Sequence, residues 1–89
     1  MAETHNDSHV TLYTTTWCPF CAKLVKNLDR TETPYARVDV EEDAEAAKWV
    51  ESVNDGNRVV PTVKYSDGSY ATNPAASEVR KKVEELAAS

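Results

Sequence analysis

Cys18 and Cys21 are the residues of this chain whose type and spacing are best suited to chemistry. Pro19 and Phe20 separate them, and Pro is frequent at the first position of a helix because an N–H group there has no partner anyway. Unpaired N–H groups and the helix dipole stabilise an anion at this point, so the sequence predicts a reactive Cys18 thiolate. Cys21 lies one turn further and is expected to be more buried, as a resolving thiol would be. The alternatives are an inert surface thiol at Cys18 and a small apolar core residue at Cys21.

Further side chains are expected to surround the reactive cysteine. Lys23, one turn along the helix, and Arg58, from across the fold, could each add positive potential. Trp17 and Phe20 flank Cys18, and we expect them to form an exposed aromatic surface for a partner. Partial packing into the core is the alternative for both aromatic side chains.

Two proline-containing dipeptides are candidates for contact with a substrate. A cis bond at Val60–Pro61 would expose a backbone edge beside the cysteine, whereas a Pro that simply starts a strand is the alternative. Asn73–Pro74 is predicted to be the N-cap and first residue of a helix, whose N-terminus could contact polar groups of a ligand. Plain capping is the alternative at this second position.

The elements that must position these residues follow from apolar periodicity. Strands are predicted over residues 10–14, 35–40, 62–65 and 69–72, with a two-residue hairpin turn at Asp67–Gly68. Helices are predicted to begin at Pro19, at the acidic residues 41–43 and at Asn73–Pro74. Their inner faces are predicted to be Cys21, Leu24, Val25 and Leu28, then Ala46, Trp49, Val50 and Val53, then Ala76, Val79, Val83 and Leu86. The order β-α-β-α-β-β-α predicts an α/β fold, a four-stranded mixed sheet with helices on both faces.

Composition restricts the classes of function. With 89 residues the chain has room for one domain, which we expect over residues 9–89, after a disordered arm at residues 1–8. The net charge of −5 argues against nucleic acid or an anionic membrane surface as a partner. The first residues lack the features of a signal peptide, and no apolar run reaches the roughly 18 residues that span a bilayer. We therefore expect a cytoplasmic protein, in which two cysteines are catalytic or metal-binding.

Four segments together resemble the glutaredoxins of the thioredoxin superfamily, and among them the mycoredoxins of mycothiol-producing bacteria. They are Trp17–Cys21 (WCPFC), Ser52–Val63 (SVNDGNRVVPTV), Tyr65–Gly68 (YSDG) and Ala71–Pro74 (ATNP), and the likeness covers about residues 10–86. The resemblance implies the thioredoxin-like (glutaredoxin) fold. Ordinary glutaredoxins hold glutathione with a Gly–Gly pair that this chain lacks. We infer that its polar, uncharged Thr72–Asn73 edge suits the hydroxyl groups of mycothiol, a cysteinyl pseudodisaccharide.

The resemblance also implies a monothiol mechanism with mycothiol as co-substrate and no bound cofactor or metal. Cys18 would attack the mixed disulfide between a protein cysteine and mycothiol, and a second mycothiol would then release Cys18. A Cys18–Cys21 disulfide would form as a side or alternative branch. A separate NADPH-dependent mycothione reductase would recycle the oxidised thiol. Site residues implied around Cys18 and Cys21 are Trp17, Pro19, Phe20, Lys23, Arg58, Val60, Pro61, Thr72 and Asn73, in a protein expected to be a monomer.

Other functions remain open at this point. A glutathione-dependent glutaredoxin and a general dithiol disulfide reductase would use the same two cysteines. His5 and His9 have a spacing that would complete a zinc site with Cys18 and Cys21, although their segment has no core to hold them. An iron–sulfur carrier is disfavoured by Pro19. A purely structural disulfide is the last alternative, which a strongly reducing potential without exchange activity would support.

Overall fold

Four strands form one mixed sheet, in the order β2-β1-β3-β4, in the computed structural model, which describes residues 9–88. The elements follow one another as β1 (Val10–Thr14), α1 (Pro19–Arg30), β2 (Ala36–Asp39), α2 (Ala44–Val53), β3 (Thr62–Tyr65), β4 (Tyr70–Thr72) and α3 (Ala76–Ala88). β1 and β2 are parallel, whereas the pairs β1–β3 and β3–β4 are antiparallel. The predicted order and the predicted mixed sheet are confirmed. The predicted arm at residues 1–8 lies outside the described residues.

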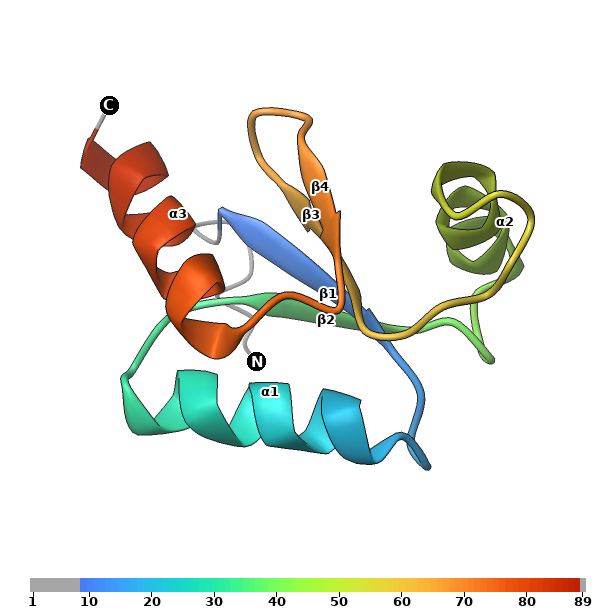
Figure 1. The fold of residues 1–89 in the computed structure, drawn as a ribbon, viewed down its shortest axis with the longest axis horizontal. Helices are drawn as coiled ribbons and strands as arrows, with labels where there is room; N and C mark the ends of the chain where they lie inside the picture. The colour runs from blue at the N-terminus through green and yellow to red at the C-terminus, as the bar shows by residue number, and fades with distance from the viewer. Residues whose placement is uncertain (1–8, 89) are drawn as a thin grey trace.

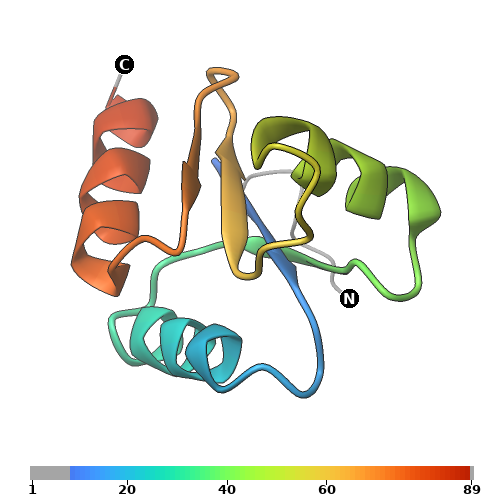
Figure 2. The same cartoon turned by 45° about the vertical axis from the view of Figure 1, so that its right-hand side comes forward.

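Helices cover both faces of the sheet, as expected. α1 and α3 lie on one side and α2 lies on the other (Figures 1 and 2). None of the helices within residues 9–88 has both the length and the apolar character needed to cross a lipid bilayer.

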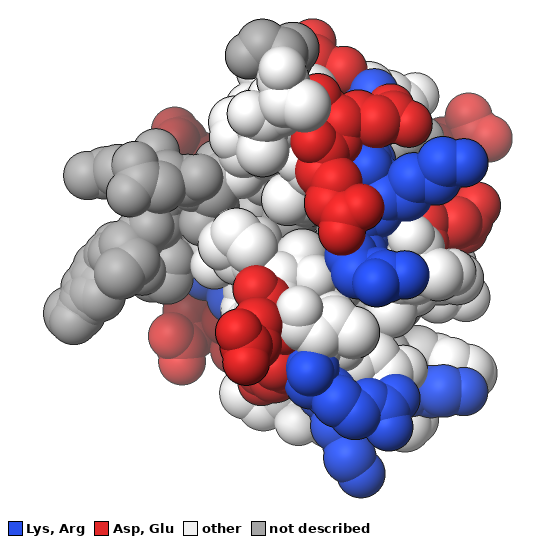
Figure 3. Space-filling view, turned by 90° about the vertical axis from the view of Figure 1, so that its left-hand side faces the viewer, with Lys and Arg blue, Asp and Glu red and all other residues white. Residues whose placement is uncertain are grey.

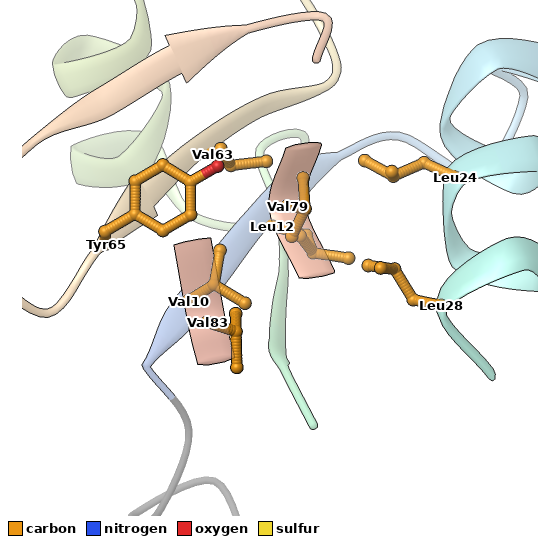
Figure 4. Packing of buried hydrophobic residues seen from close by; sticks show 8 residues of the cluster. All are labelled: Val10, Leu12, Leu24, Leu28, Val63, Tyr65, Val79 and Val83. Atoms are coloured by element: carbon orange, nitrogen blue, oxygen red, sulfur yellow. The ribbon is translucent and has the colours of Figure 1, made fainter. Parts of the chain in front are cut away.

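The larger core lies between the sheet and the helices α1 and α3 (Figure 4). Alternate residues of β1, Val10 and Leu12, face it because successive strand side chains point to opposite sides of a sheet. The cluster consists of Val10, Leu12, Leu24, Leu28, Val63, Tyr65, Val79 and Val83. Because α1 contributes Leu24 and Leu28, this packing fixes the helix that carries the cysteine pair.

A smaller core lies beneath α2. It consists of Val40, Ala46, Ala47 and Val50, with Tyr13, Val38, Trp49 and Val60 packed against it. Trp49 was expected in the core and is half-buried, with its ring centroid 4.9 Å from that of Tyr13. This cluster holds the end of α2 and Val60 against the sheet, close to the predicted substrate edge.

Two helices begin later than the sequence predicts. α2 begins at Ala44 rather than within residues 41–43, because the carboxylate of Asp43 is its N-cap and accepts a bond from the Ala46 N–H at 3.1 Å. α3 begins at Ala76, so the prediction that Asn73 caps it and Pro74 opens it is wrong. Asn73 instead adopts a left-handed conformation, with φ of 49°, which turns the chain before the helix.

Three strand boundaries also differ from the prediction. β2 is shorter than residues 35–40, and β4 begins at Tyr70 rather than at residue 69. The β3–β4 turn has three residues instead of two, since Tyr65 N–H donates to Ser69 O at 2.8 Å across it. Gly68 takes the left-handed conformation, φ 91°, that such a three-residue turn requires at its last position.

Candidate active site

Cys18 occupies the N-cap position of α1, directly after the loop that follows β1. Its backbone is extended, and its carbonyl accepts the first helical hydrogen bond, from Ala22 N–H at 3.1 Å. The Cys21 N–H donates to the Cys18 Sγ at 3.2 Å, as an N–H donates to the oxygen of an ordinary capping residue. The Cys21 N–H, which has no partner within the helix, is therefore directed at the Cys18 sulfur. This is the arrangement from which the sequence predicts a thiolate at Cys18.

Cys21 lies on the inner face of the same helix and has no exposed surface, whereas Cys18 is 5% exposed. Both are free thiols. Burial, and to a lesser degree a hydrogen bond with the Cys18 side chain, raises the pKa of Cys21 to about 12, against a smaller opposing effect of the Thr15 backbone. Cys21 is consequently protonated at neutral pH.

The Val60–Pro61 peptide bond is cis, which is the conformation that would expose a backbone edge to a substrate. The Cys18 thiol lies 3.8 Å from the Val60 carbonyl oxygen, to which it donates. On the other side, the Pro61 carbonyl accepts from the Asn73 N–H at 2.7 Å. Cys18, Val60 and Asn73, far apart in the sequence, are thus brought to one place by the N-terminal end of α1 and the ends of β3 and β4.

Asn54 connects the elements on which this edge depends. Its Nδ2 donates to the Val50 carbonyl at 2.8 Å and to Thr62 Oγ1 at 3.3 Å, and its Oδ1 accepts from the Thr72 hydroxyl at 2.7 Å. The Thr62 hydroxyl in turn donates to the Val59 carbonyl at 2.7 Å. The sequence analysis gave the Asn54 side chain no role in the site. Its place directly after the last apolar position of α2 was the available signal, because side-chain amides often satisfy free carbonyls at helix ends.

Phe20, Lys23 and Asn73 line one open hollow of about 440 Å³ between α1 and the beginning of α3. Phe20 is 63% exposed, in agreement with the expected aromatic surface. Thr72 is exposed as well, although its hydroxyl already donates to Asn54. The structure therefore brings Phe20, Lys23 and Asn73 together along one hollow, and Cys18 is not among the residues that line it.

Trp17 lies on the opposite flank of the cysteine pair. It is 66% exposed, and its Nε1–H donates to a carboxylate oxygen of Glu41 at 2.9 Å. The sequence gave Glu41 a role at the start of α2, but the residue precedes that helix and holds the indole instead.

Arg58 does not join the group around Cys18. Its Nε and Nη2 both lie 3.2 Å from one carboxylate oxygen of Glu51 on α2. A long side chain in the loop after α2 can reach back to that helix, and this ion pair directs the guanidinium there.

Of the four residues of the alternative zinc site, the structure describes His9, Cys18 and Cys21. His5 lies outside the described residues, and the His9 Nδ1 is 3.1 Å from the Ser66 hydroxyl. Within residues 9–88, no three or more His, Cys, Asp or Glu residues are grouped closely enough to hold a metal ion.

Comparison with known proteins relates this arrangement to thiol redox enzymes. Residues 10–70 match the family model of the glutaredoxins. The chain is 60% identical over 80 residues to Mycoredoxin 1 of Corynebacterium glutamicum, which covers 90% of this chain and 99% of the relative.

Solved structures give the same fold. A crystal structure of a thioredoxin-like protein superposes with a TM-score of 0.66 at 25% identity, covering 81% of this chain and 96% of the other. A glutaredoxin from Methanosarcina mazei superposes with a TM-score of 0.69 at 23% identity, covering 86% of this chain and 79% of the other.

Proposed function

We propose that this protein reduces mixed disulfides between protein cysteines and mycothiol. The premise is that the chain belongs to the glutaredoxin family and is a thiol–disulfide oxidoreductase. The observation that carries this proposal is the Cys18 sulfur, capped by a helix N–H and facing the Val60 backbone edge. The likeness to a relative named as a mycoredoxin supports the choice of the small thiol.

In the proposed reaction the Cys18 thiolate attacks the mycothiol sulfur of the mixed disulfide. The bond to the protein cysteine breaks, the protein leaves as a reduced thiolate, and mycothiol becomes bound to Cys18. A second mycothiol, as its thiolate, then attacks its disulfide-bonded counterpart, which restores Cys18 and releases the oxidised dimer. The net exchange consumes one free mycothiol and yields one protein thiol and one oxidised dimer, and Cys21 takes no part. Donation from the Cys21 N–H favours Cys18 as the leaving sulfur in the second step.

The edge at Thr72 and Asn73 supports a sugar-containing thiol. Both residues are uncharged and exposed, and the Thr72 hydroxyl, which donates to Asn54, keeps lone pairs for sugar hydroxyl donors. Mycothiol has no γ-glutamyl carboxylate, so it needs no cationic or glycine-rich cradle. The backbone of Val60 and Pro61 would align the cysteinyl part of the thiol beside Cys18.

One turnover assay tests the chemistry and the thiol together. Wild type, Cys18→Ser and Cys21→Ser are compared on one peptide carrying either mycothiol or glutathione in mixed disulfide. We expect Cys18→Ser to lose activity completely, Cys21→Ser to retain a substantial fraction, and mycothiol to be preferred. Equal rates with the two thiols would refute the mycothiol assignment, and loss of activity in Cys21→Ser would refute the monothiol route.

A dithiol reaction is the second candidate, because the Cys21 thiol lies within hydrogen-bond reach of Cys18. In that reaction Cys21 would displace mycothiol from Cys18 and leave a Cys18–Cys21 disulfide. The raised pKa of Cys21 makes this displacement slow at neutral pH, since a thiol must lose its proton before it attacks. We therefore assign it to a side branch.

The remaining parts of the proposal concern the cell. We propose that the protein acts as a monomer in the cytoplasm on mycothiolated proteins, with no resident cofactor. An NADPH-dependent mycothione reductase would return the oxidised dimer to mycothiol. Coupling the purified protein to such a reductase, with NADPH consumption as the measured signal, tests the complete cycle.

A further inference from the structure

Trp17 directly precedes Cys18 and keeps most of its indole ring in solvent. Its side chain is 66% exposed, more than that of Phe20 or Tyr70. The indole is nevertheless held in place, because its Nε1–H donates to the Glu41 carboxylate at 2.9 Å. The Glu41 backbone is fixed as well, through its N–H, which donates to Asp39 Oδ1 at 2.8 Å. We call Trp17 and Glu41 the indole–carboxylate pair.

The two residues of this pair come from loops that leave the same edge of the sheet. β1 and β2 are parallel, so the loop that follows each of them lies at the same end (Figures 1 and 2). Glu41 also lines an open hollow of about 440 Å³ beside α2, whose lining includes Glu42 and the apolar Val40 and Ala47. The pair is therefore joined to Cys18 through Trp17, and to a hollow outside the Phe20 region through Glu41.

Negative charge is concentrated in the segment that carries Glu41. Five of the seven residues 39–45 are acidic, namely Asp39, Glu41, Glu42, Asp43 and Glu45. None of them is in an ion pair within residues 9–88, where the ion pairs join Arg58 to Glu51 and Lys82 to Asp67. By contrast, Figure 3 shows Lys and Arg beside Asp and Glu on the face that carries α3. The loop before α2 therefore offers an unpaired negative charge at the Trp17 flank of the site.

The chemistry of the reaction indicates what kind of partner meets this flank. The small thiol is assigned to the Val60 edge and to Thr72 and Asn73, so a client bonded to the same disulfide needs another surface beside Cys18. A cysteine enters a mixed disulfide as a thiolate, and a neighbouring Lys or Arg favours the thiolate form. Clients therefore tend to carry a cation close to the modified cysteine. A guanidinium can stack on an indole ring and pair with a carboxylate at the same time.

We propose that the indole–carboxylate pair binds the client polypeptide through an Arg or Lys that lies within two residues of the cysteine to be reduced. The cation would stack on Trp17 and pair with Glu41, while the small thiol lies on the opposite flank. Glu41 would thus determine specificity without touching the reacting sulfur atoms. The inference rests on the proposed function in taking Cys18 as the attacking thiol and in the flank that it gives to the small thiol.

The test uses short peptides that carry one cysteine in mixed disulfide with a small thiol. Matched pairs contain Arg or Gln at one of the two positions before or after the cysteine. Single-turnover release of the peptide thiol is measured with the full chain, for mycothiol and glutathione adducts. Each rate is divided by that of the same peptide with free mercaptoethanol, because a cation also activates its own leaving thiol. We expect the normalised rate to be about fivefold higher for Arg than for Gln in at least one position.

Variants locate the effect. Glu41→Gln keeps an oxygen that can accept the indole N–H but removes the charge, and should lower the Arg-to-Gln ratio to about twofold or less. Glu45→Gln is the matched control, since Glu45 is an exposed acid of the same segment that does not line the hollow, and it should keep the full ratio. The wild-type ratio should also shrink in about 0.5 M salt, where screening is strong. Because each ratio compares two peptides on one protein, partial unfolding of a variant does not change it.

Equal normalised rates for Arg and Gln at all four positions would overturn the assignment, as would a full ratio in Glu41→Gln. Size-exclusion chromatography checks the other occupant: a wild-type dimer that dissociates in Trp17→Ala would give this surface to a second copy and also overturn the proposal. A different outcome concerns the proposed function alone. If glutathione adducts react at least as fast as mycothiol adducts while the Arg preference persists, the mycothiol assignment is wrong and the client surface stands.

Discussion

At the scale of single residues, Cys18 and Cys21 show how one helical turn separates two different surroundings for a thiol. The Cys18 sulfur lies at the N-terminal end of α1 and accepts a backbone N–H, whereas the Cys21 side chain has no exposed surface. The sequence alone predicted this division, because the position of a residue relative to a helix start determines both its donors and its burial. It did not predict the direction of Arg58, since a long side chain in a loop selects its partner through contacts that sequence spacing does not reveal.

The raised pKa of Cys21 has a consequence for stability. The folded state keeps the Cys21 proton up to a pH of about 12, whereas the unfolded chain loses it near the ordinary value of 9.0. The contribution of this proton to folding is therefore complete below pH 9 and is lost as the pH rises toward 12.

We predict that the free energy of unfolding falls more steeply above pH 9 in wild type than in Cys21→Ala. Urea unfolding of both reduced proteins, at intervals from pH 7 to pH 10.5, measures the difference. The difference should be constant at the lower pH values and should shrink above pH 9. Since Tyr13, Tyr35 and Tyr65 are present in both proteins, the effect of their raised pKa values on stability is common to both. A difference that stays constant throughout would show that Cys21 is not held as a buried thiol.

At the scale of elements, the substrate edge depends on a polar network between the end of α2 and the strands β3 and β4. Asn54 satisfies a free carbonyl of α2 and reaches both Thr62 and Thr72. Thr62 is fully buried, so its hydroxyl needs the partners that this network supplies. The network therefore holds the loop that carries Val60 at a fixed distance from Cys18.

We predict that Asn54→Ala raises the KM for the mixed disulfide about threefold to tenfold and lowers kcat less, because one or two hydrogen bonds that position the edge are lost. Steady-state kinetics of peptide reduction measure the two constants separately. Asn57→Ala is the control, an exposed Asn in the same loop, and should leave both constants unchanged. An unchanged KM in a folded Asn54→Ala protein would show that the edge is positioned by the backbone alone.

Thr72 provides a second check of this network, with a substrate peptide that carries a small thiol without a sugar. Thr72→Val removes the hydroxyl that donates to Asn54, and should raise the KM by a similar factor. Thr72→Ser keeps the hydroxyl and should restore the KM of wild type. If the serine variant behaves like the valine variant, the methyl group rather than the hydrogen bond is what the site needs.

The elements themselves were predicted better than their ends. Apolar periodicity identified every strand and helix, because periodicity reports which face is buried. The start of α3 was misplaced because Asn73–Pro74 has the composition of a cap, while Asn73 in fact turns the chain toward Pro61 through its N–H.

At the scale of the whole molecule, the small size of the domain determines how much a single core residue matters. Domains of this size have net stabilities toward the lower end of about 5–15 kcal/mol. Two core clusters share that stability unequally, with eight buried residues on the side of α1 and α3 and four beneath α2. The redox helix is therefore held chiefly by the larger cluster, through Leu24 and Leu28 on its inner face.

We predict that Leu28→Ala lowers the free energy of unfolding by about 2–5 kcal/mol, since Leu28 has no exposed surface and its removal leaves a cavity. Val25→Ala, on the same helix but half-buried, should cost roughly 1 kcal/mol. Urea unfolding at 25 °C measures both. Leu28 is ten residues beyond Cys18, so the folded fraction of Leu28→Ala should keep the wild-type kcat. Equal losses of stability in the two variants would contradict the central place of Leu28, and a lower kcat in the fully folded protein would show that core packing tunes the cysteine as well as holding its helix.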